Sequence, residues 1–188
     1  MNQATIKPKF YVLAGTESAG KTSVINELAK RGFQYVDEAA RKVIAQYEQE
    51  HQGKMLEDAK ITYCERLIEQ SIKDYIDNQH NNDVIFFDRG LPDAAYASSG
   101  ILGEVPEATH QAIKNHRYHS RVFFFPPWEE IYTPDGIRQD SFSQIQQSYD
   151  EIKKAYVDYQ YEIVEVPKVD IKGRVNFILN ELDIDVSE

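Results

Sequence analysis

The feature that most constrains this chain is a glycine-rich segment of eight residues that matches the pattern G-x-x-x-x-G-K-[ST] in full. The glycines of this pattern allow backbone conformations that other residues avoid, so that successive amide N–H groups point into one cavity and bind phosphate oxygens. The helix that follows adds the positive end of its dipole to the same anion site. The matching residues are Gly15, Thr16, Glu17, Ser18, Ala19, Gly20, Lys21 and Thr22, and Ser23 follows them in the first helical turn.

The sequence on either side of this motif predicts the strand and the helix that such a loop requires. Residues 10–14 form an unbroken apolar run, which is typical of a strand buried on both faces. Residues 20–31 carry apolar side chains at helical spacing and are followed by Gly32, a common helix stop. Two glycines that only turn a strand into a helix are the alternative, but the flanking elements favour a phosphate-binding loop.

The rest of the chain continues this alternation of apolar β-rich runs and helical patterns. It predicts a three-layer α/β/α fold with a mostly parallel five-stranded sheet. At ~100–200 residues per domain, 188 residues predict a single domain that spans 1–188. The expected strands are 10–14, 33–36, 84–87, 122–125 and 161–166, and the expected helices are 20–31, 55–76, 104–115, 142–159 and a last one from about residue 170.

Two side chains of the loop are expected to contact the nucleotide and its metal ion directly. In loops of this kind the lysine, here Lys21, reaches the β- and γ-phosphates, and the hydroxyl of Thr22 coordinates Mg²⁺. We therefore expect ATP and Mg²⁺ as cofactors and Lys21 as a catalytic residue.

Asp88 and Arg89 follow the apolar strand at 84–87 and form a second candidate site. A phosphate loop needs a carboxylate near the metal at the end of a neighbouring strand, and Asp88 meets that need as a metal ligand and catalytic residue. Arg89 stands where a hydrolytic ATPase is expected to carry a glutamate, and its planar fork of N–H donors suits a substrate with anionic or hydroxyl groups. A solvated charge pair before a turn is the alternative, but α/β sheets bind ligands at the carboxyl ends of their strands.

Glu38 and Arg41 follow the second strand and lie on one helix face, because they are three residues apart. Next to the phosphate loop, Glu38 could accept a proton from an attacking hydroxyl group or bind sugar hydroxyls, and Arg41 could contact the same substrate. A surface ion pair worth a few tenths of a kcal/mol is an equally good interpretation of this spacing.

The segment at about 126–141 is expected to form an irregular lid, because three of the seven prolines fall within nine of its residues. Arg138 of this segment is placed to neutralise the charge that develops during phosphoryl transfer, and Gly136 offers a hinge. Asp135 is a candidate contact for the substrate.

The charge and the cysteine count exclude several classes of protein. With 31 Asp and Glu against 21 Lys and Arg, the net charge of −10 disfavours a general nucleic-acid binder and a protein that binds anionic membrane surfaces.

The single cysteine, Cys64, excludes an internal disulfide and a cysteine-cluster metal site. No stretch approaches the ~20 apolar residues of a membrane span, and residues 1–7 are polar. We expect a cytoplasmic protein whose partners are a nucleotide and a small-molecule substrate; a protein partner or a homo-oligomer stays open.

Four segments together resemble the NadR-like AAA-domain family of P-loop proteins, whose best understood members are ribosylnicotinamide kinase domains. These segments are the phosphate loop, residues 37–41 (DEAAR), residues 87–93 (FDRGLPD) and the lid elements at 127–128 and 135–138. The resemblance covers about residues 10–179 and implies a fold like that of nucleoside and nucleotide kinases, with Arg138 as the lid arginine. It also implies that adenine lies between the lid and the loop after Val166, near Pro167 and Lys168.

The leading hypothesis is an ATP- and Mg²⁺-dependent kinase that transfers the γ-phosphate of ATP to the hydroxyl of a small, nucleoside-like molecule. The alternative is an ATP-dependent regulatory switch that acts through a protein partner; a GTPase switch is disfavoured because the chain has no Asn-Lys-x-Asp motif. An oligomeric ATPase that remodels nucleic acid is disfavoured by the net charge of −10.

Overall fold

The computed structural model describes residues 5–6, 9–52, 59–131 and 141–184. The helices are α1 (Lys21–Lys30), α2 (Ala39–His51), α3 (Lys60–Asn78), α4 (Leu91–Leu102), α5 (Glu107–Asn115), α6 (Phe142–Asp158) and α7 (Ile171–Glu181), with a 3₁₀ turn at Glu129–Ile131. The strands are β1 (Thr5–Ile6), β2 (Phe10–Gly15), β3 (Gln34–Val36), β4 (Ile85–Asp88), β5 (His116–Arg117), β6 (Arg121–Phe125) and β7 (Glu162–Glu165).

A five-stranded parallel sheet with the strand order β3-β4-β2-β6-β7 forms the centre of the structure. β2 is the middle strand: Val12 pairs with Phe87 of β4 on one side and with Val122 of β6 on the other. β3 and β4 therefore lie on one side of β2, and β6 and β7 lie on the other. The strand order reverses at β2, and open α/β sheets bind their ligands at the carboxyl ends of the strands at such a point.

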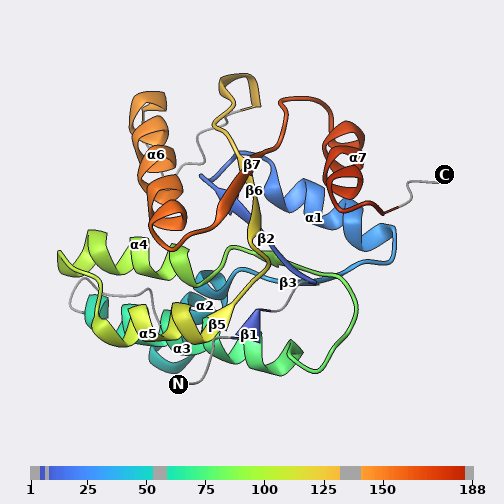
Figure 1. Ribbon diagram of the computed structural model, residues 1–188. Helices are drawn as coiled ribbons and strands as arrows, with labels where there is room; N and C mark the ends of the chain where they lie inside the picture. The colour runs from blue at the N-terminus through green and yellow to red at the C-terminus, as the bar shows by residue number, and fades with distance from the viewer. Residues whose placement is uncertain (1–4, 7–8, 53–58, 132–140, 185–188) are drawn as a thin grey trace.

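Alternate side chains of β2 enter two separate hydrophobic clusters, one on each face of the sheet. Phe10, Val12 and Ala14 belong to the cluster formed with α3, α4, α5 and α6, whereas Leu13 belongs to the cluster formed with α1 and α7. Figure 1 shows the result, with α1 and α7 on one face of the sheet and the other helices on the opposite face. Successive side chains of a strand point to opposite faces of the sheet. Because helices cover both faces, the sheet becomes the middle one of three layers.

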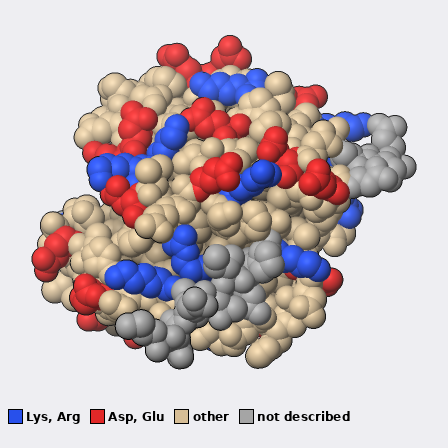
Figure 2. Space-filling model, in the orientation of Figure 1, with Lys and Arg blue, Asp and Glu red and all other residues tan. Residues whose placement is uncertain are grey.

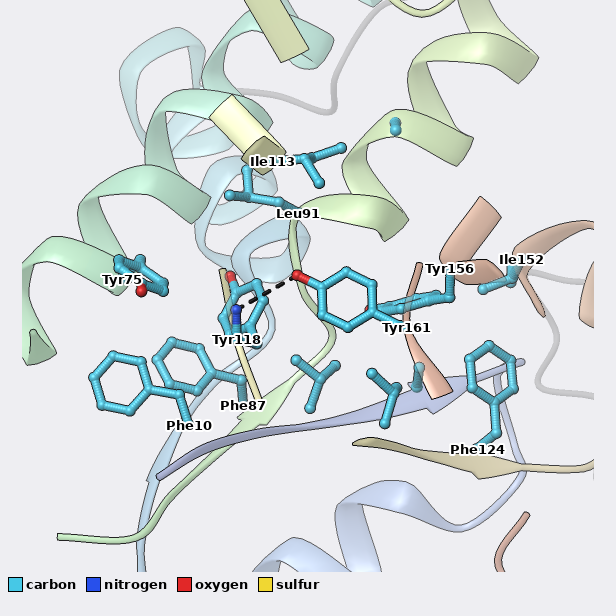
Figure 3. Packing of buried hydrophobic residues seen from close by; sticks show 14 of the residues in the cluster. Phe10, Tyr75, Phe87, Leu91, Ile113, Tyr118, Phe124, Ile152, Tyr156 and Tyr161 are labelled. Atoms are coloured by element: carbon cyan, nitrogen blue, oxygen red, sulfur yellow. Dashed lines mark hydrogen bonds between the residues drawn. The ribbon is translucent and has the colours of Figure 1, made fainter. Parts of the chain in front are cut away.

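Aromatic rings fill much of the larger cluster. Phe10 meets Tyr75 edge-on at 5.4 Å between ring centroids, and Phe124 meets Tyr156 at the same distance. Figure 3 shows these rings between the sheet and the helices, with the backbone N–H of Tyr118 donating to a neighbouring tyrosine hydroxyl. Because an edge-to-face pair adds about 0.5–1.5 kcal/mol beyond its buried area, these contacts hold α3 and α6 firmly against the sheet.

The three-layer arrangement and the five parallel strands predicted from the sequence are confirmed. The sequence pattern did not predict α4. Its many small residues give only a weak recurrence of apolar side chains at helical spacing, and Gly90 was interpreted as part of a turn. Pro92 in the first turn and Asp93 at the third helical position are nevertheless start signals. The paired strands β1 and β5 were also not predicted, since two residues each are too short to show a pattern.

The surface carries both signs of charge. On the face shown in Figure 2, acidic and basic side chains are interspersed over the molecule. None of the described helices combines the length and the apolar composition that crossing a bilayer requires. Cys64 is buried in α3, as expected of a small apolar side chain on a regular helix.

Candidate active site

The glycine-rich segment forms the connection between the carboxyl end of β2 and α1. Gly15 (φ 124°) and Gly20 (φ 85°) both adopt left-handed conformations that favour glycine. A Cβ atom on Gly15 would lie only 2.5 Å from the carbonyl oxygen of Phe125, so a larger residue does not fit there. Ser18 also has a positive φ, of 55°. A loop of this shape before a helix presents its backbone N–H groups to an anion.

Lys21 is the first residue of α1 and is buried beside this loop. Its Nζ donates to the carbonyl oxygens of Gly15 (3.2 Å) and Thr16 (2.5 Å). Burial, reinforced by the charge of Arg89, lowers the pKa of Lys21 to about 7, although nearby carboxylates act in the opposite direction. A bound phosphate would add negative charge and favour the protonated ammonium.

The loop opens into a cavity of about 1280 Å³. We group its main lining residues by the elements that carry them and call the two groups the loop side and the helix side. The loop side consists of residues 16–18, 20–23 and 169–172 with Trp128, Ile131 and Arg174. The helix side consists of side chains from α3, α4 and α6 with Tyr118, namely Tyr63, Leu67, Ser71, Asp74, Ala94, Tyr96, Ala97, Ile145, Ser148 and Ile152. Glu38, Arg41, Asp88, Arg89 and Asp93 belong to the lining of the same cavity.

Glu38 directly precedes α2, and arginines hold both of its carboxylate oxygens. Oε1 accepts from Arg89 Nε (3.0 Å) and Oε2 accepts from Arg41 Nε (3.1 Å). The Glu38 and Arg89 side chains are 14% and 15% exposed, whereas Arg41 is 73% exposed, so the Arg89 contact is the stronger one. Burial alone would raise the pKa of Glu38, but the charges of Arg89 and Lys21 outweigh it and lower the pKa. Glu38 is therefore an ionised carboxylate at neutral pH.

Arg89 follows β4 in a left-handed conformation (φ 70°) that is uncommon for residues other than glycine. Besides Glu38, its guanidinium donates through Nη1 to the carbonyl oxygen of Gly15 (3.0 Å) and to Asp93 Oδ1 (3.3 Å). Although burial opposes it, the charges of Asp93 and Glu38 raise the pKa of Arg89 above its ordinary value. The arginine predicted to contact a substrate thus makes three contacts within the protein.

Asp88 ends β4 beside the loop, where it pairs in register with Leu13 of β2. Burial raises the pKa of Asp88, while the charges of Lys21 and Arg89 lower it in part. Within the part of the chain that the structure describes, Asp88 Oδ1 is buried without a hydrogen-bond partner. Such an oxygen is a ready ligand for a cation, and the Thr22 side chain lines the same cavity.

The residues present fit a magnesium ion that shares its ligands with phosphate. The described residues contain no group of three or more His, Cys, Asp or Glu that could hold a metal by themselves. Mg²⁺ is usually held by one or two carboxylates together with substrate phosphates and water. Asp88 and Thr22 match that ligand set.

Arg174 of α7 supports the loop through a hydrogen bond. Its Nη1 donates to the carbonyl oxygen of Ala19 (3.0 Å), and a Cβ atom on Gly20 would lie 2.7 Å from the same nitrogen. The guanidinium lies 5.2 Å from the centroid of the Trp128 ring, a cation–π contact. Trp128 is half-buried and lines the cavity.

The structure places most of the sequence-predicted residues in one cavity. The loop residues 16–18 and 20–23 line it, while Gly15 and Ala19 belong to the loop without lining it. Pro167 and Lys168 are not part of the lining, although residues 169–172 directly after them are. Asp135 and Arg138 lie outside the described residues, as does 132–140 of the predicted lid.

Sequence reasoning did not identify Arg174, Asp93 or Tyr156 as site residues. Arg174 looks like one more charged residue of an amphipathic helix, and its burial against the loop is visible only in three dimensions. For Asp93 a signal was present, because an acidic residue at the third helical position can accept from the N-cap backbone N–H, as Asp93 Oδ2 does from Gly90. Tyr156 lies at the spacing of a core residue in α6 and is buried, but its hydroxyl donates to Asp93.

The loop and the sheet define a P-loop protein whose fold is like that of nucleoside and nucleotide kinases. The sequence model of an AAA domain family matches residues 10–174. The chain belongs to this family, and the resemblance to NadR-like P-loop proteins is confirmed. A search of the curated proteins gives no match.

Three solved structures illustrate the likeness in fold. Deoxyadenosine kinase from M. mycoides, solved with dCMP and dCDP, has a TM-score of 0.62 and 18% identity over 93% of this chain and 98% of that one. NadR protein in complex with NR has a TM-score of 0.71 and 15% identity; the match covers 99% of this chain but only 54% of NadR. Thymidylate kinase from Ehrlichia chaffeensis has a TM-score of 0.60 and 13% identity, and the match covers 94% of this chain and 99% of that one.

Proposed function

We propose that this protein transfers the γ-phosphoryl group of ATP to a hydroxyl group of a small, nucleoside-like molecule. The observation that carries the proposal is the cavity, because one space of about 1280 Å³ is lined by the phosphate loop, by Glu38 and by residues of α3, α4 and α6. Pockets for a single small ligand measure about 300–1,000 Å³. The cavity is therefore large enough for a nucleotide and an acceptor side by side.

The nucleotide is assigned to the loop side. Its β- and γ-phosphates lie against the N–H groups of the loop and the ammonium of Lys21. The base lies toward Trp128 and the segment that begins at Pro167 and Lys168, where Val169 and Ile171 are exposed and line the cavity. A flat aromatic ring gains most where exposed apolar groups are covered on binding.

A magnesium ion would be held by the Thr22 hydroxyl and the Asp88 carboxylate together with the phosphates. When bound, it supplies positive charge that neutralises the transferring phosphoryl group. Lys21 carries a positive charge at the same place, and the lid arginine, Arg138, is proposed as a third cation.

The acceptor is assigned to the helix side, with its hydroxyl at Glu38. Because Glu38 is ionised at neutral pH, it can accept the proton of the acceptor hydroxyl. The acceptor oxygen then forms a bond to the γ-phosphorus, and the bond from that phosphorus to the β–γ bridging oxygen breaks. The products are ADP and a phosphorylated acceptor. Arg89 holds Glu38 in place, and Arg41 and Asp135 are proposed to contact the acceptor.

Acceptor-dependent release of ADP tests this proposal. A suitable panel takes its acceptors from the structural neighbours: deoxyadenosine, deoxycytidine and nicotinamide riboside, with thymidylate as a comparison whose acceptor group is a phosphate. We expect at least one nucleoside to stimulate ADP release, and we expect Glu38→Gln to lower the stimulated rate by about 10²–10⁴-fold. A slow rate that no acceptor changes would contradict the kinase and favour the alternative, an ATP-dependent switch that acts through a protein partner.

A further inference from the structure

We infer that Asp93 is a positioning residue for the transfer step: through Arg89 it fixes the orientation of Glu38, and Tyr156 in turn fixes Asp93. The inference rests on the proposed function, in which Glu38 accepts the proton. Its physical basis is a chain of side-chain contacts that runs from α6 through α4 to the start of α2.

The two carboxylate oxygens of Asp93 have different partners. Asp93 is buried, at 8% exposure. Its Oδ2 accepts from the backbone N–H of Gly90 (2.8 Å) and from the hydroxyl of Tyr156. Its Oδ1 accepts from Arg89 Nη1 (3.3 Å). The Oδ2 contact with Gly90 caps α4, which is an ordinary structural role, but the Oδ1 contact adds nothing to that cap.

The guanidinium of Arg89 transmits this constraint to Glu38. Asp93 and the carbonyl oxygen of Gly15 both hold its Nη1, and Nε donates to Glu38. A guanidinium is planar and rigid, so fixing Nη1 also fixes the direction in which the Nε–H points. Without Asp93, Nη1 would keep only the carbonyl oxygen of Gly15, and the guanidinium would lose one of the three hydrogen bonds that limit its rotamer freedom. Asp93 thus helps to order the donor that orients the Glu38 carboxylate.

Tyr156 gives Asp93 a rigid support. Its side chain is fully buried, with the ring packed edge-on against Phe124 at 5.4 Å and Tyr161 at 5.6 Å (Figure 3). Burial, and then the charge of Asp93, raises the pKa of the Tyr156 hydroxyl well above its ordinary value. The hydroxyl therefore stays protonated and donates to Asp93.

Two variants separate positioning from simple capping. In Asp93→Asn, the single amide oxygen can take the place of Oδ2 and keep both of its donors, while the NH₂ group faces Arg89 and cannot accept from it. Tyr156→Phe removes only the hydroxyl and keeps the ring. Tyr161→Phe is the matched control, because its hydroxyl belongs to the same ring cluster but accepts from the Tyr118 backbone N–H.

The first measurement does not depend on activity: it is the ¹H–¹⁵N NMR signal of the Arg89 Nε–H group, assigned with Arg89→Lys. We expect a sharp, slowly exchanging signal in the wild type and in Tyr161→Phe. We expect this signal to be broadened or lost in Asp93→Asn and Tyr156→Phe. An unchanged signal in Asp93→Asn would overturn the inference, whatever activity the protein has.

The second measurement is the rate of transfer to the best acceptor. Asp93→Asn and Tyr156→Phe should lower kcat by up to about 100-fold, the cost of a misplacement of about 1 Å, and leave KM for ATP unchanged. In a Glu38→Gln background, Asp93→Asn should add no further loss, because residues that act as a unit are not additive. Equal losses in both backgrounds would overturn the inference. A wild type without any acceptor-dependent transfer would instead overturn the proposed function, and the NMR signal would then decide the positioning role alone.

Discussion

The loop side and the helix side of the cavity are built from different parts of the chain. The loop side depends on backbone N–H groups of one continuous segment, residues 15–22, with two glycines in conformations that favour glycine. The helix side depends on side chains from α3, α4 and α6, whose residues are far apart in the sequence. A site made of backbone groups binds the same phosphate in any such protein, whereas a site made of side chains changes with each substitution. In the proposed function, nucleotide binding therefore belongs to the first side and acceptor choice to the second.

The largest effect is expected at the loop side, in Lys21→Ala. The change removes the buried ammonium that faces the phosphates, so both MgATP binding and transfer should be lost while the fold is kept. Thermal unfolding is the measurement: ligand at ~100 times its dissociation constant stabilises the wild type by about 2.7 kcal/mol, and the variant should gain nothing. An equal thermal shift in the variant would contradict the role of Lys21.

Glu38 lies between the two sides, and Glu38→Gln should slow the transfer step without weakening the binding of MgATP. The glutamine keeps the shape of the side chain but cannot take up the proton, so kcat should fall by about 10²–10⁴-fold. Stabilisation by MgATP should equal that of the wild type. If the variant lost ATP binding and kept kcat, Glu38 would belong to the nucleotide site and not to the acceptor.

Ala97→Phe places a ring in the helix side and should exclude the acceptor. We expect KM for the acceptor to rise about tenfold, equivalent to 1.4 kcal/mol, with the dissociation constant of ATP unchanged. Ser99→Phe is the matched control, since Ser99 is exposed on the same helix and does not line the cavity. Weaker ATP binding in Ala97→Phe would show that the two sides are not independent.

Trp128→Ala is the corresponding change on the loop side. Loss of the ring should weaken ATP binding by about 1 kcal/mol, or roughly fivefold, because the base loses an aromatic contact. Binding of inorganic tripolyphosphate, measured by calorimetry, should stay the same, since it has no base. An equal loss for both ligands would mean that Trp128 acts through Arg174 on the loop.

The smallest effect is expected for Arg41→Gln and concerns pH. The hydrogen bond and the charge of Arg41 help to lower the pKa of Glu38, so their removal should raise it. The acidic limb of the pH profile of kcat/KM should then move to higher pH. Because Arg41 is mostly exposed, the shift should stay below about 0.7 pH unit, which corresponds to ~1 kcal/mol. A shift to lower pH would contradict this direction.

The loop side could be predicted from the sequence much better than the contacts between distant side chains. The phosphate loop, β2 and Asp88 follow from local patterns, because each depends on neighbours within a few residues. Glu38 could equally have been a surface residue, and its contact with Arg89, 51 positions away, decides the matter.

Arg174 could not be predicted at all, because its partner Ala19 lies 155 positions away and nothing in the sequence of α7 distinguishes that arginine from its neighbours. Although the capping contact of Asp93 with Gly90 is local, the contact between Tyr156 and Asp93, 63 positions apart, could not be predicted either. Each of these contacts exists only because the three layers bring distant helices and strands together.

The most direct test of the account follows the γ-phosphoryl group itself. The protein is incubated with γ-¹⁸O-labelled ATP, Mg²⁺ and the nucleoside panel, and the products are identified by mass spectrometry. The account predicts a labelled nucleoside phosphate formed in step with ADP in the wild type and formed at least about 100-fold more slowly in Glu38→Gln. Label found only in inorganic phosphate, with every acceptor, would contradict it.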